Sequence, residues 1–269
     1  EAILKELGLG RGDVKQLETI PYDQLAAAYK KAAPAIQASG GYVGNEPHIS
    51  KDYVGDPIHH GFREHAQKIP VLIGTVLGEF DFRMPLAGKR EFDRETALSY
   101  VRQRFGDGAE QIMDLFAQIY PEKCPVDARS VDFLFRGPTI DFIKERSKTP
   151  ESVTYSYQLT YDFPVFDGKL AWHCSEIPFA FHNIDKVPVC NCGEETNRMQ
   201  EQICQAWVSF ARTGKPEISG IEWPACADGD EAVMMLDKEC RIRHNPDHEL
   251  VNRLKKLQTA EHSVENVQH

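Results

Sequence analysis

The chain has 269 residues, of which 41% are hydrophobic, and a formal net charge of −10 from 41 acidic and 31 basic side chains. This length can bury a core as one domain or as part of a larger one, and the acidic balance disfavours nucleic acid and anionic membrane surfaces as partners. No apolar run approaches the roughly 20 residues that cross a bilayer, so we expect no membrane-spanning segment.

The first sixty residues predict short helices followed by a loop. Residues 24–31 are good helix formers, and Pro34 is expected to end their helix. Residues 38–57 are rich in glycine, proline and polar side chains, which is typical of a loop. At its end, Asp56 is expected to cap a short helix that has Pro57 at its first position.

Strand and helix patterns alternate over the rest of the chain. Residues 69–76 form a continuous apolar run, typical of a strand buried on both faces of a parallel sheet. The later segments predict helices at 93–105, 108–120, 127–147, 196–213 and 247–260, and strands at 153–159 and 231–237. Strands separated by helices predict an α/β fold. These few strands do not complete a doubly wound sheet, so further strands are expected elsewhere.

Two polar residues stand where an α/β fold often carries chemistry. Glu79 comes just after the apolar strand, at the edge of a parallel sheet where functional side chains gather. His173 lies in a loop between Trp172 and a polar run, and taken alone it is more simply interpreted as structural. A catalytic histidine needs a carboxylate to orient its second ring nitrogen, and α/β-hydrolases place the acid before the histidine in the chain. Glu79 and His173 satisfy both requirements.

Three segments resemble those of type-B carboxylesterases, the family of bacterial para-nitrobenzyl esterases and cholinesterases. They are IPVLIGTVLGEF around Glu79, WHCSEIPFAF around His173, and MQEQICQAWVSFARTGKP followed by IEWP. The resemblance implies the C-terminal part of an α/β-hydrolase fold, with a partial, mostly parallel mixed sheet and many helices. It also implies that Glu79 is the triad acid, that His173 is the base, and that Glu176 supports the pocket. Cys174 departs from a common glycine of the family and would place an oxidisable thiol beside the histidine.

The resemblance also implies a domain organisation. Residues 1–269 are expected to form a single region, the C-terminal half of a catalytic domain. Within it, 1–60 is a helical segment and loop, and 61–269 holds the acid strand, a helical insert, the histidine loop and C-terminal helices. The chain begins Glu1-Ala2-Ile3 without an initiator methionine, and we expect it to be part of something longer.

The nucleophile of such an enzyme is absent from this sequence. No Gly-x-Ser-x-Gly occurs, the nearest approach being residues 37–41, and no glycine-rich oxyanion segment is visible. We therefore expect this chain to be inactive alone and the intact protein to hydrolyse carboxylic esters. Its expected partners are a small-molecule ester and the missing N-terminal half, in the same polypeptide or an associated chain. No cofactor is expected, and the net acidity weakly favours cationic or neutral esters. The aromatic residues expected to line an apolar pocket are Phe80, Phe82, Trp172 and Phe179.

Other interpretations of the chain are weaker. A non-catalytic, esterase-like binding module is the main alternative, although it would have no chemical need for both Glu79 and His173. His60 and Glu64 would share one face of a helix beside His59 and His65, but a metal site there is not expected. The pair Cys190 and Cys192 lacks a second pair at zinc-finger spacing.

The cysteine count bears on the compartment. Seven cysteines is an odd number, which argues against a complete disulfide framework. Cys204 lies among helical apolar positions, where a free thiol behaves as a small hydrophobe. We therefore expect a reducing compartment and favour the cytoplasm.

Overall fold

The computed structural model describes residues 1–39, 47, 49–165 and 167–265, with the backbone alone over 258–265. Its helices are α1 (Ala2–Glu6), α2 (Tyr22–Ala38), α3 (Pro57–His60), α4 (Glu64–Gln67), α5 (Arg94–Phe105), α6 (Ala109–Ile119), α7 (Arg136–Ser147), α8 (Ile177–Ala180), α9 (Glu194–Thr213) and α10 (His248–Glu265). Its strands are β1 (Val71–Val76), β2 (Thr154–Leu159), β3 (Asp162–Phe163), β4 (Lys169–Leu170), β5 (Ala232–Leu236) and β6 (Arg241–His244). None of the described helices is both long and apolar enough to span a membrane.

The described chain divides into two compact units, Glu1–Gly55 and Asp56–His269. In the first, α1 packs against α2 and a small apolar core forms between them. The expectation that Pro34 ends the second helix was wrong, because α2 continues through it to Ala38. Pro34 has no backbone N–H, so the carbonyl of Lys30 loses its helical donor, yet the helix continues beyond the proline. Ser39 follows, and residues 40 and 41 of the Ser-Gly-Gly run lie outside the described residues.

The second unit is built on a four-stranded sheet in the order β1-β2-β5-β6. Strands β1, β2 and β5 are parallel, and β6 runs antiparallel to β5. This confirms the prediction of a partial, mostly parallel mixed sheet. Strand β6 was not predicted, because its sequence, Arg-Ile-Arg-His, has little apolar character and stays largely accessible at the sheet edge.

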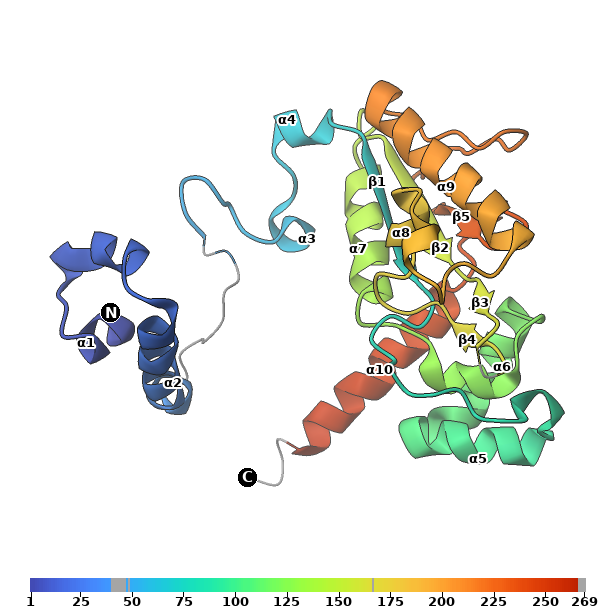
Figure 1. The fold of residues 1–269 in the computed structure, drawn as a ribbon, viewed down its shortest axis with the longest axis horizontal. Coiled ribbons are helices and arrows are strands. Elements are labelled where there is room, and N and C mark those ends of the chain that lie inside the picture. The colour runs from blue at the N-terminus through green and yellow to red at the C-terminus, as the bar shows by residue number, and fades with distance from the viewer. Residues whose placement is uncertain (40–46, 48, 166, 266–269) are drawn as a thin grey trace. The chain divides into compact units, whose positions relative to one another are not determined.

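Both faces of this sheet are covered by helices (Figure 1). Side chains of β5 show why: Val233 and Met235 enter a core with α5, α6 and α10, whereas Met234 and Leu236 enter a core with α8 and α9. Alternate residues of one strand therefore face two different cores, so a parallel strand here must be apolar throughout.

Strand β1 lies at the border of the sheet, and among the described residues its one partner strand is β2. Its sequence, Val-Leu-Ile-Gly-Thr-Val, contains no charge or proline, which are common on exposed edges. Only its last residues are buried, so the expectation of a strand buried on both faces holds only at its carboxyl end. At that end the chain enters the loop that carries Glu79.

Two predictions about the ends of helices in the second unit had different outcomes. Asp56 caps α3 as expected, because its carboxylate accepts a hydrogen bond of 2.9 Å from the N–H of Ile58. Residues 127–147 are not one helix: a 3-10 helix, Pro125–Ser130, is followed by an irregular segment before α7 begins at Arg136.

Candidate active site

Glu79 lies in the tight turn that follows β1. Its φ of +32° is uncommon for a residue with a side chain. The turn folds the carboxylate back on the strand, where Oε1 accepts a hydrogen bond of 2.9 Å from the N–H of Val76. The residue is only 6% exposed. The carboxylate is therefore held in one orientation by its own strand.

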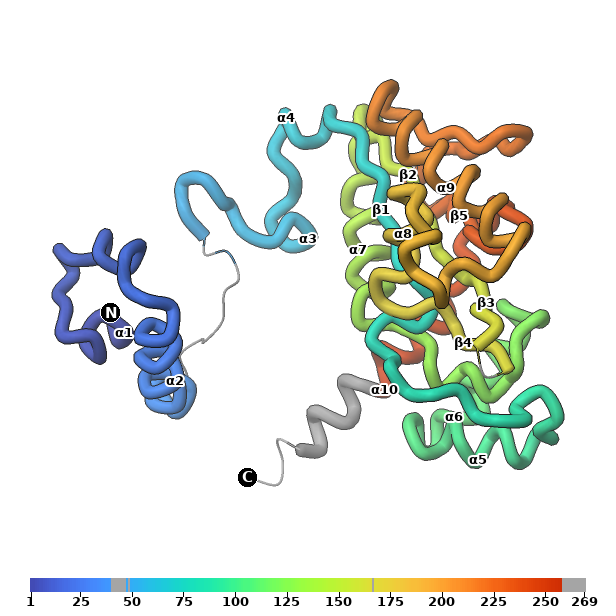
Figure 2. The backbone as a smooth tube through the Cα atoms, in the orientation of Figure 1, coloured from blue at the N-terminus to red at the C-terminus, as the bar shows by residue number. Residues whose placement is uncertain are grey.

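The loop that carries His173 is joined to the Glu79 turn by two backbone hydrogen bonds. The Glu79 turn follows β1, and the His173 loop lies between β4 and α8 (Figure 2). The N–H of Gly78 donates to the carbonyl of Ala171 at 2.7 Å, and the N–H of His173 donates to the carbonyl of Glu79 at 2.8 Å. A Cβ at position 78 would lie 2.9 Å from the carbonyl oxygen of Ala171. Glycine at position 78 therefore permits the close approach of the two loops.

The side chains of the two predicted residues meet. Oε2 of Glu79 lies 2.8 Å from Nδ1 of His173. The imidazole contacts the ring of Phe80, with ring centroids 4.2 Å apart, and that of Phe135, at 5.7 Å, and these two phenyl rings contact each other at 5.3 Å. About a third of the histidine side chain, 37%, is exposed. Because Nδ1 faces the carboxylate, Nε2 is the nitrogen left to exchange a proton with a reacting group.

Two further carboxyl groups lie near Glu79. Burial raises the pKa of Asp132, and the charge of Glu79 acts in the same direction. Burial also raises the pKa of Glu176, again with a contribution from Glu79. Oε2 of Glu176 is buried and has no hydrogen-bond partner among the described residues. Glu79 is thus accompanied by two further carboxyl groups whose pKa values are raised.

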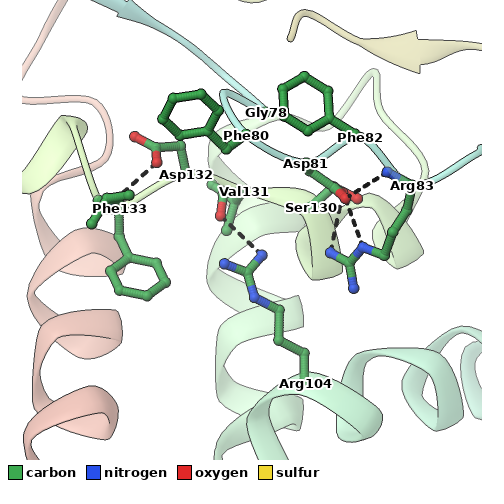
Figure 3. A pocket seen from close by; sticks show the side chains of 11 residues that line it. Gly78, Phe80, Asp81, Phe82, Arg83, Arg104, Ser130, Val131, Asp132 and Phe133 are labelled. Atoms are coloured by element: carbon green, nitrogen blue, oxygen red, sulfur yellow. Dashed lines mark hydrogen bonds and ion pairs between the residues drawn. The ribbon is translucent and has the colours of Figure 1, made fainter. Parts of the chain in front are cut away.

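A cavity of about 650 Å³ opens beside the histidine, and we call it the Phe80 cavity (Figure 3). The eleven residues that line it come from the turn after β1, from α5 and from the segment before α7: Gly78, Phe80, Asp81, Phe82, Arg83, Arg104, Ser130, Val131, Asp132, Phe133 and Leu134. Phe80 is shared between this cavity and the ring contact with His173.

The aromatic residues expected at the pocket fall into two groups. Phe80 and Phe82 line the Phe80 cavity as expected. Phe179 is fully buried in the core beside α9, and the partly buried Trp172 packs on Phe163 at 4.6 Å in the same core, so neither is among the residues that line the Phe80 cavity. Phe135 was missed, because the pattern over 127–147 predicted a continuous helix and gave no sign of its contact with His173.

The histidine and cysteine candidates for metal binding are not brought together. His60 ends α3 and Glu64 begins α4, so the two do not share a helix face; Gly61, with a φ of +73°, separates the helices. Within the described ranges, no three His, Cys, Asp or Glu side chains are close enough to hold a metal ion. All seven cysteines are free thiols. Cys174 is exposed, and desolvation raises its thiol pKa, with Glu176 and Glu79 contributing.

Comparison with known proteins shows which family this chain resembles. Residues 7–254 match the Carboxylesterase family. The chain is 24% identical over 254 residues to a para-nitrobenzyl esterase of Bacillus subtilis, covering 92% of this chain and 50% of that protein. It is 31% identical over 199 residues to a phenmedipham hydrolase of Pseudarthrobacter oxydans, covering 69% and 40%.

The structural comparison agrees. An esterase from Clostridium hathewayi that can hydrolyse aliphatic aromatic polyesters is 40% identical, with a TM-score of 0.85, covering 95% of this chain and 51% of that structure. The chain thus spans about half the length of the Bacillus subtilis esterase and of the Clostridium hathewayi esterase. From this match and the fold, we conclude that the chain belongs to the type-B carboxylesterase family and has the α/β-hydrolase fold of its esterases.

Proposed function

We propose that this chain is the C-terminal half of a serine carboxylesterase, in which Glu79 and His173 form a catalytic triad with a serine from an upstream segment. The observation that carries the proposal is the 2.8 Å contact between Oε2 of Glu79 and Nδ1 of His173. A buried carboxylate that fixes one ring nitrogen makes the other nitrogen an effective general base.

Each group has a defined role in the proposed reaction. The upstream serine attacks the ester carbonyl while Nε2 of His173 takes its proton, and the imidazolium then gives this proton to the leaving alcohol. Water releases the acyl group by the same steps in the second half-reaction. Glu79 holds the tautomer throughout and stabilises the imidazolium.

Features of β1 support an upstream partner segment. Its outer edge is apolar, and Thr75 on this strand has a buried hydroxyl that finds no hydrogen-bond partner in the described chain. The buried hydroxyl of Ser175, two residues after His173, also has no hydrogen-bond partner among the described residues. Because unpaired strand edges and buried hydroxyls are both costly, we infer that a strand from the other half of the enzyme pairs with β1.

The same proposal makes the chain inactive by itself. Acyl transfer needs a nucleophile and backbone donors for the oxyanion, and the sequence contains neither a Gly-x-Ser-x-Gly nor a glycine-rich oxyanion segment.

Hydrolysis of p-nitrophenyl acetate and butyrate tests this proposal. The 269-residue chain is compared with a longer polypeptide that includes the upstream half. We expect turnover from the longer form alone, and a loss of about 10³-fold or more in kcat for its His173→Ala variant. His182→Ala is the matched control, because His182 also lies 2.8 Å from a glutamate, Glu201, but on the surface.

Two outcomes would contradict the proposal. Saturable turnover by the short chain would show that it contains its own nucleophile. If neither form hydrolyses any ester, the non-catalytic binding module becomes the better account.

A further inference from the structure

The Phe80 cavity is lined by two arginines and two aspartates as well as by aromatic rings. Phe80, Phe82 and Phe133 provide the aromatic surface, and Arg83 and Arg104 lie among the polar residues around it (Figure 3). The two arginines equal the two aspartates in number, so the cavity does not share the negative excess of the chain, whose net charge is −10. A pocket with an apolar body and a few placed charges is the usual form of a small-molecule site.

Arg104, in the last turn of α5, forms no ion pair with a carboxylate of the described residues. Its hydrogen bonds in the described chain both leave from Nη1 and end on neutral carbonyl oxygens, of Arg129 at 2.6 Å and Val131 at 3.2 Å. The guanidinium also lies 4.7 Å from the ring centroid of Phe105 and 5.5 Å from that of Phe133. Desolvation lowers its pKa and the charge of Arg83 lowers it further, whereas the charges of Asp81 and Asp132 act in the opposite direction without outweighing them.

A second arginine shows what a purely structural role looks like. Arg146 is also bonded mainly to carbonyl oxygens, but it uses all three of its nitrogens. Nε donates to the hydroxyl of Thr154, Nη1 to the carbonyl of Ala66 and Nη2 to the carbonyl of Ile69. Arg104 differs because its bonds use one nitrogen and its side chain forms part of a cavity wall.

The two acidic residues of the cavity, Asp81 and Asp132, already accept hydrogen bonds from other groups. Asp81 accepts two hydrogen bonds from the guanidinium of Arg83, at 2.6 and 3.1 Å. The carboxylate of Asp132 accepts backbone N–H groups at the start of α7, including that of Arg136 at 2.9 Å. Neither carboxylate forms an ion pair with Arg104 in the part of the chain that the structure describes. The charges of Asp81 and Asp132 act on Arg104 through space and not by contact, so its guanidinium keeps donors for an anion that enters the cavity.

Two further cations, Arg129 and Lys169, add positive charge beside the Phe80 cavity. Arg129 donates to the carbonyl of Met84, and Lys169 donates to the carbonyls of Asp81 and Arg83. Neither cation belongs to an ion pair of the described residues. Lys169 and Arg129 border a small depression that shares Gly78 and Asp81 with the Phe80 cavity, so the positive charge continues along this wall.

We propose that the Phe80 cavity binds a carboxylate carried by the ester substrate, and that Arg104 is the specificity-determining residue. This rests on the proposed function, because the scissile ester must lie at His173. The Phe80 ring contacts His173 at 4.2 Å and also lines the cavity, so a substrate held at the histidine reaches the arginine by passing one aromatic ring. The substrate class is therefore an ester with a carboxylate beyond an apolar spacer. The net charge of the chain suggested a preference for neutral or cationic esters. The arginine in this cavity favours an anionic ester instead.

Paired substrates test the proposal in the longer, active form of the enzyme. 4-Acetoxybenzoate against 4-acetoxybenzamide places the charge on the leaving alcohol, and mono-4-nitrophenyl adipate against 4-nitrophenyl hexanoate places it on the acyl group. For at least one pair, we expect Arg104→Gln to lower kcat/KM of the charged member by about tenfold or more, since charge-assisted hydrogen bonds are the strong ones. The neutral member should change less than about threefold, because it makes no such bond. Arg104→Lys should restore part of the loss.

The control is Arg102→Gln, on the same helix but exposed. An equal loss for both members of both pairs would overturn the proposal, because it would show that Arg104 only supports the loop at 129–131. Failure of the unsubstituted enzyme to cleave any of the four esters, charged or neutral, would instead refute the proposed function.

A binding measurement needs no nucleophile and uses the 269-residue chain itself. Calorimetric titration compares benzoate with benzamide on the chain and on its Arg104→Gln variant. We expect benzoate to bind more tightly than benzamide, and the substitution to weaken benzoate alone by about tenfold. Equal affinities for the two ligands, or benzoate binding that the substitution leaves unchanged, would overturn the anion subsite.

Discussion

Glu79 and His173 are joined twice, once through their side chains and once through their backbones. Oε2 of Glu79 lies 2.8 Å from Nδ1 of His173, and the carbonyl of Glu79 accepts the N–H of His173 at 2.8 Å. The two residues are 94 positions apart in the chain. The double connection fixes the imidazole relative to the acid without relying on one flexible contact, as a preorganised base requires.

Phe80 is expected to position the histidine ring. Replacing it by alanine removes the closer of the two aromatic contacts of His173, and we expect kcat of the longer enzyme to fall about 10- to 100-fold because the base is no longer held in line. Phe82→Ala is the control, since Phe82 lines the same cavity and contacts Phe80 rather than the histidine. Steady-state kinetics on a p-nitrophenyl ester measures both. Equal losses in the two variants would contradict a positioning role.

Gly78 is expected to be intolerant of a side chain. A Cβ there would lie 2.9 Å from the carbonyl oxygen of Ala171 and 3.3 Å from Cβ of Leu170. Gly78→Ala should lower the free energy of unfolding by about 1–3 kcal/mol, the usual cost of overpacking. Gly12→Ala, where a Cβ meets nothing within 4 Å, should not destabilise the protein. Urea denaturation measures both, and a stable Gly78→Ala variant would show that the two loops can separate freely.

Cys174 occupies a backbone conformation that favours glycine. Its φ is +68°, and the left-handed region costs roughly 1–2 kcal/mol for a residue with a Cβ. Cys174→Gly should therefore raise the free energy of unfolding, by about 0.5–1 kcal/mol after the greater entropy of the unfolded glycine is subtracted. Cys174→Ala keeps the Cβ and removes the thiol, so it should bring no such gain. Equal stabilisation by both substitutions would attribute the effect to the thiol instead.

Glu231 is expected to make stability depend on pH. Burial alone would raise its pKa, but the charge of Arg136 and hydrogen bonds from His248, Arg136 and Ser156 outweigh burial and hold the pKa at about 2. Because this folded-state pKa lies below the unfolded value, the stabilisation is complete above about pH 4.5 and is lost as the pH falls towards 2. The amount is at most about 3 kcal/mol.

Denaturation midpoints at pH 7 and pH 3.5 measure this effect. Glu231→Gln should destabilise the protein at pH 7, because it leaves Arg136 with less compensation, and it should reduce the difference between the two pH values. Asp114→Asn, which breaks an exposed pair with Arg94, should change stability by less than about 1 kcal/mol. An unchanged pH dependence in Glu231→Gln would contradict the assignment.

The sequence was informative where function depends on local segments. Glu79 and His173 each stand in a short motif, and the structure brings both side chains together as the hypothesis required. Most helices and the three parallel strands were also predictable, because their apolar periodicity reflects cores on both faces of the sheet. The domain organisation over 1–269 stays a prediction.

Features that arise from packing between distant segments were not predictable. The pattern at 127–147 predicted one helix, yet an irregular segment interrupts it and brings Phe135 to His173 and Phe133 to Arg104. Strand β6 is specified by its pairing with β5 rather than by its own polar sequence. Helix α2 passes Pro34 although proline disfavours a helix interior, and the local sequence did not indicate this.

The most direct test of the central claim is kcat of Glu79→Gln in the longer enzyme, beside Glu201→Gln. Both glutamates lie 2.8 Å from a histidine nitrogen, but only Glu79 is buried and faces the proposed base. We predict that Glu79→Gln lowers kcat by about 10³- to 10⁴-fold with little change in KM, because an amide no longer fixes the productive tautomer or stabilises the imidazolium. Glu201→Gln should leave kcat unchanged. Full activity in Glu79→Gln would contradict the assignment of Glu79 and His173 as the acid and base of the esterase.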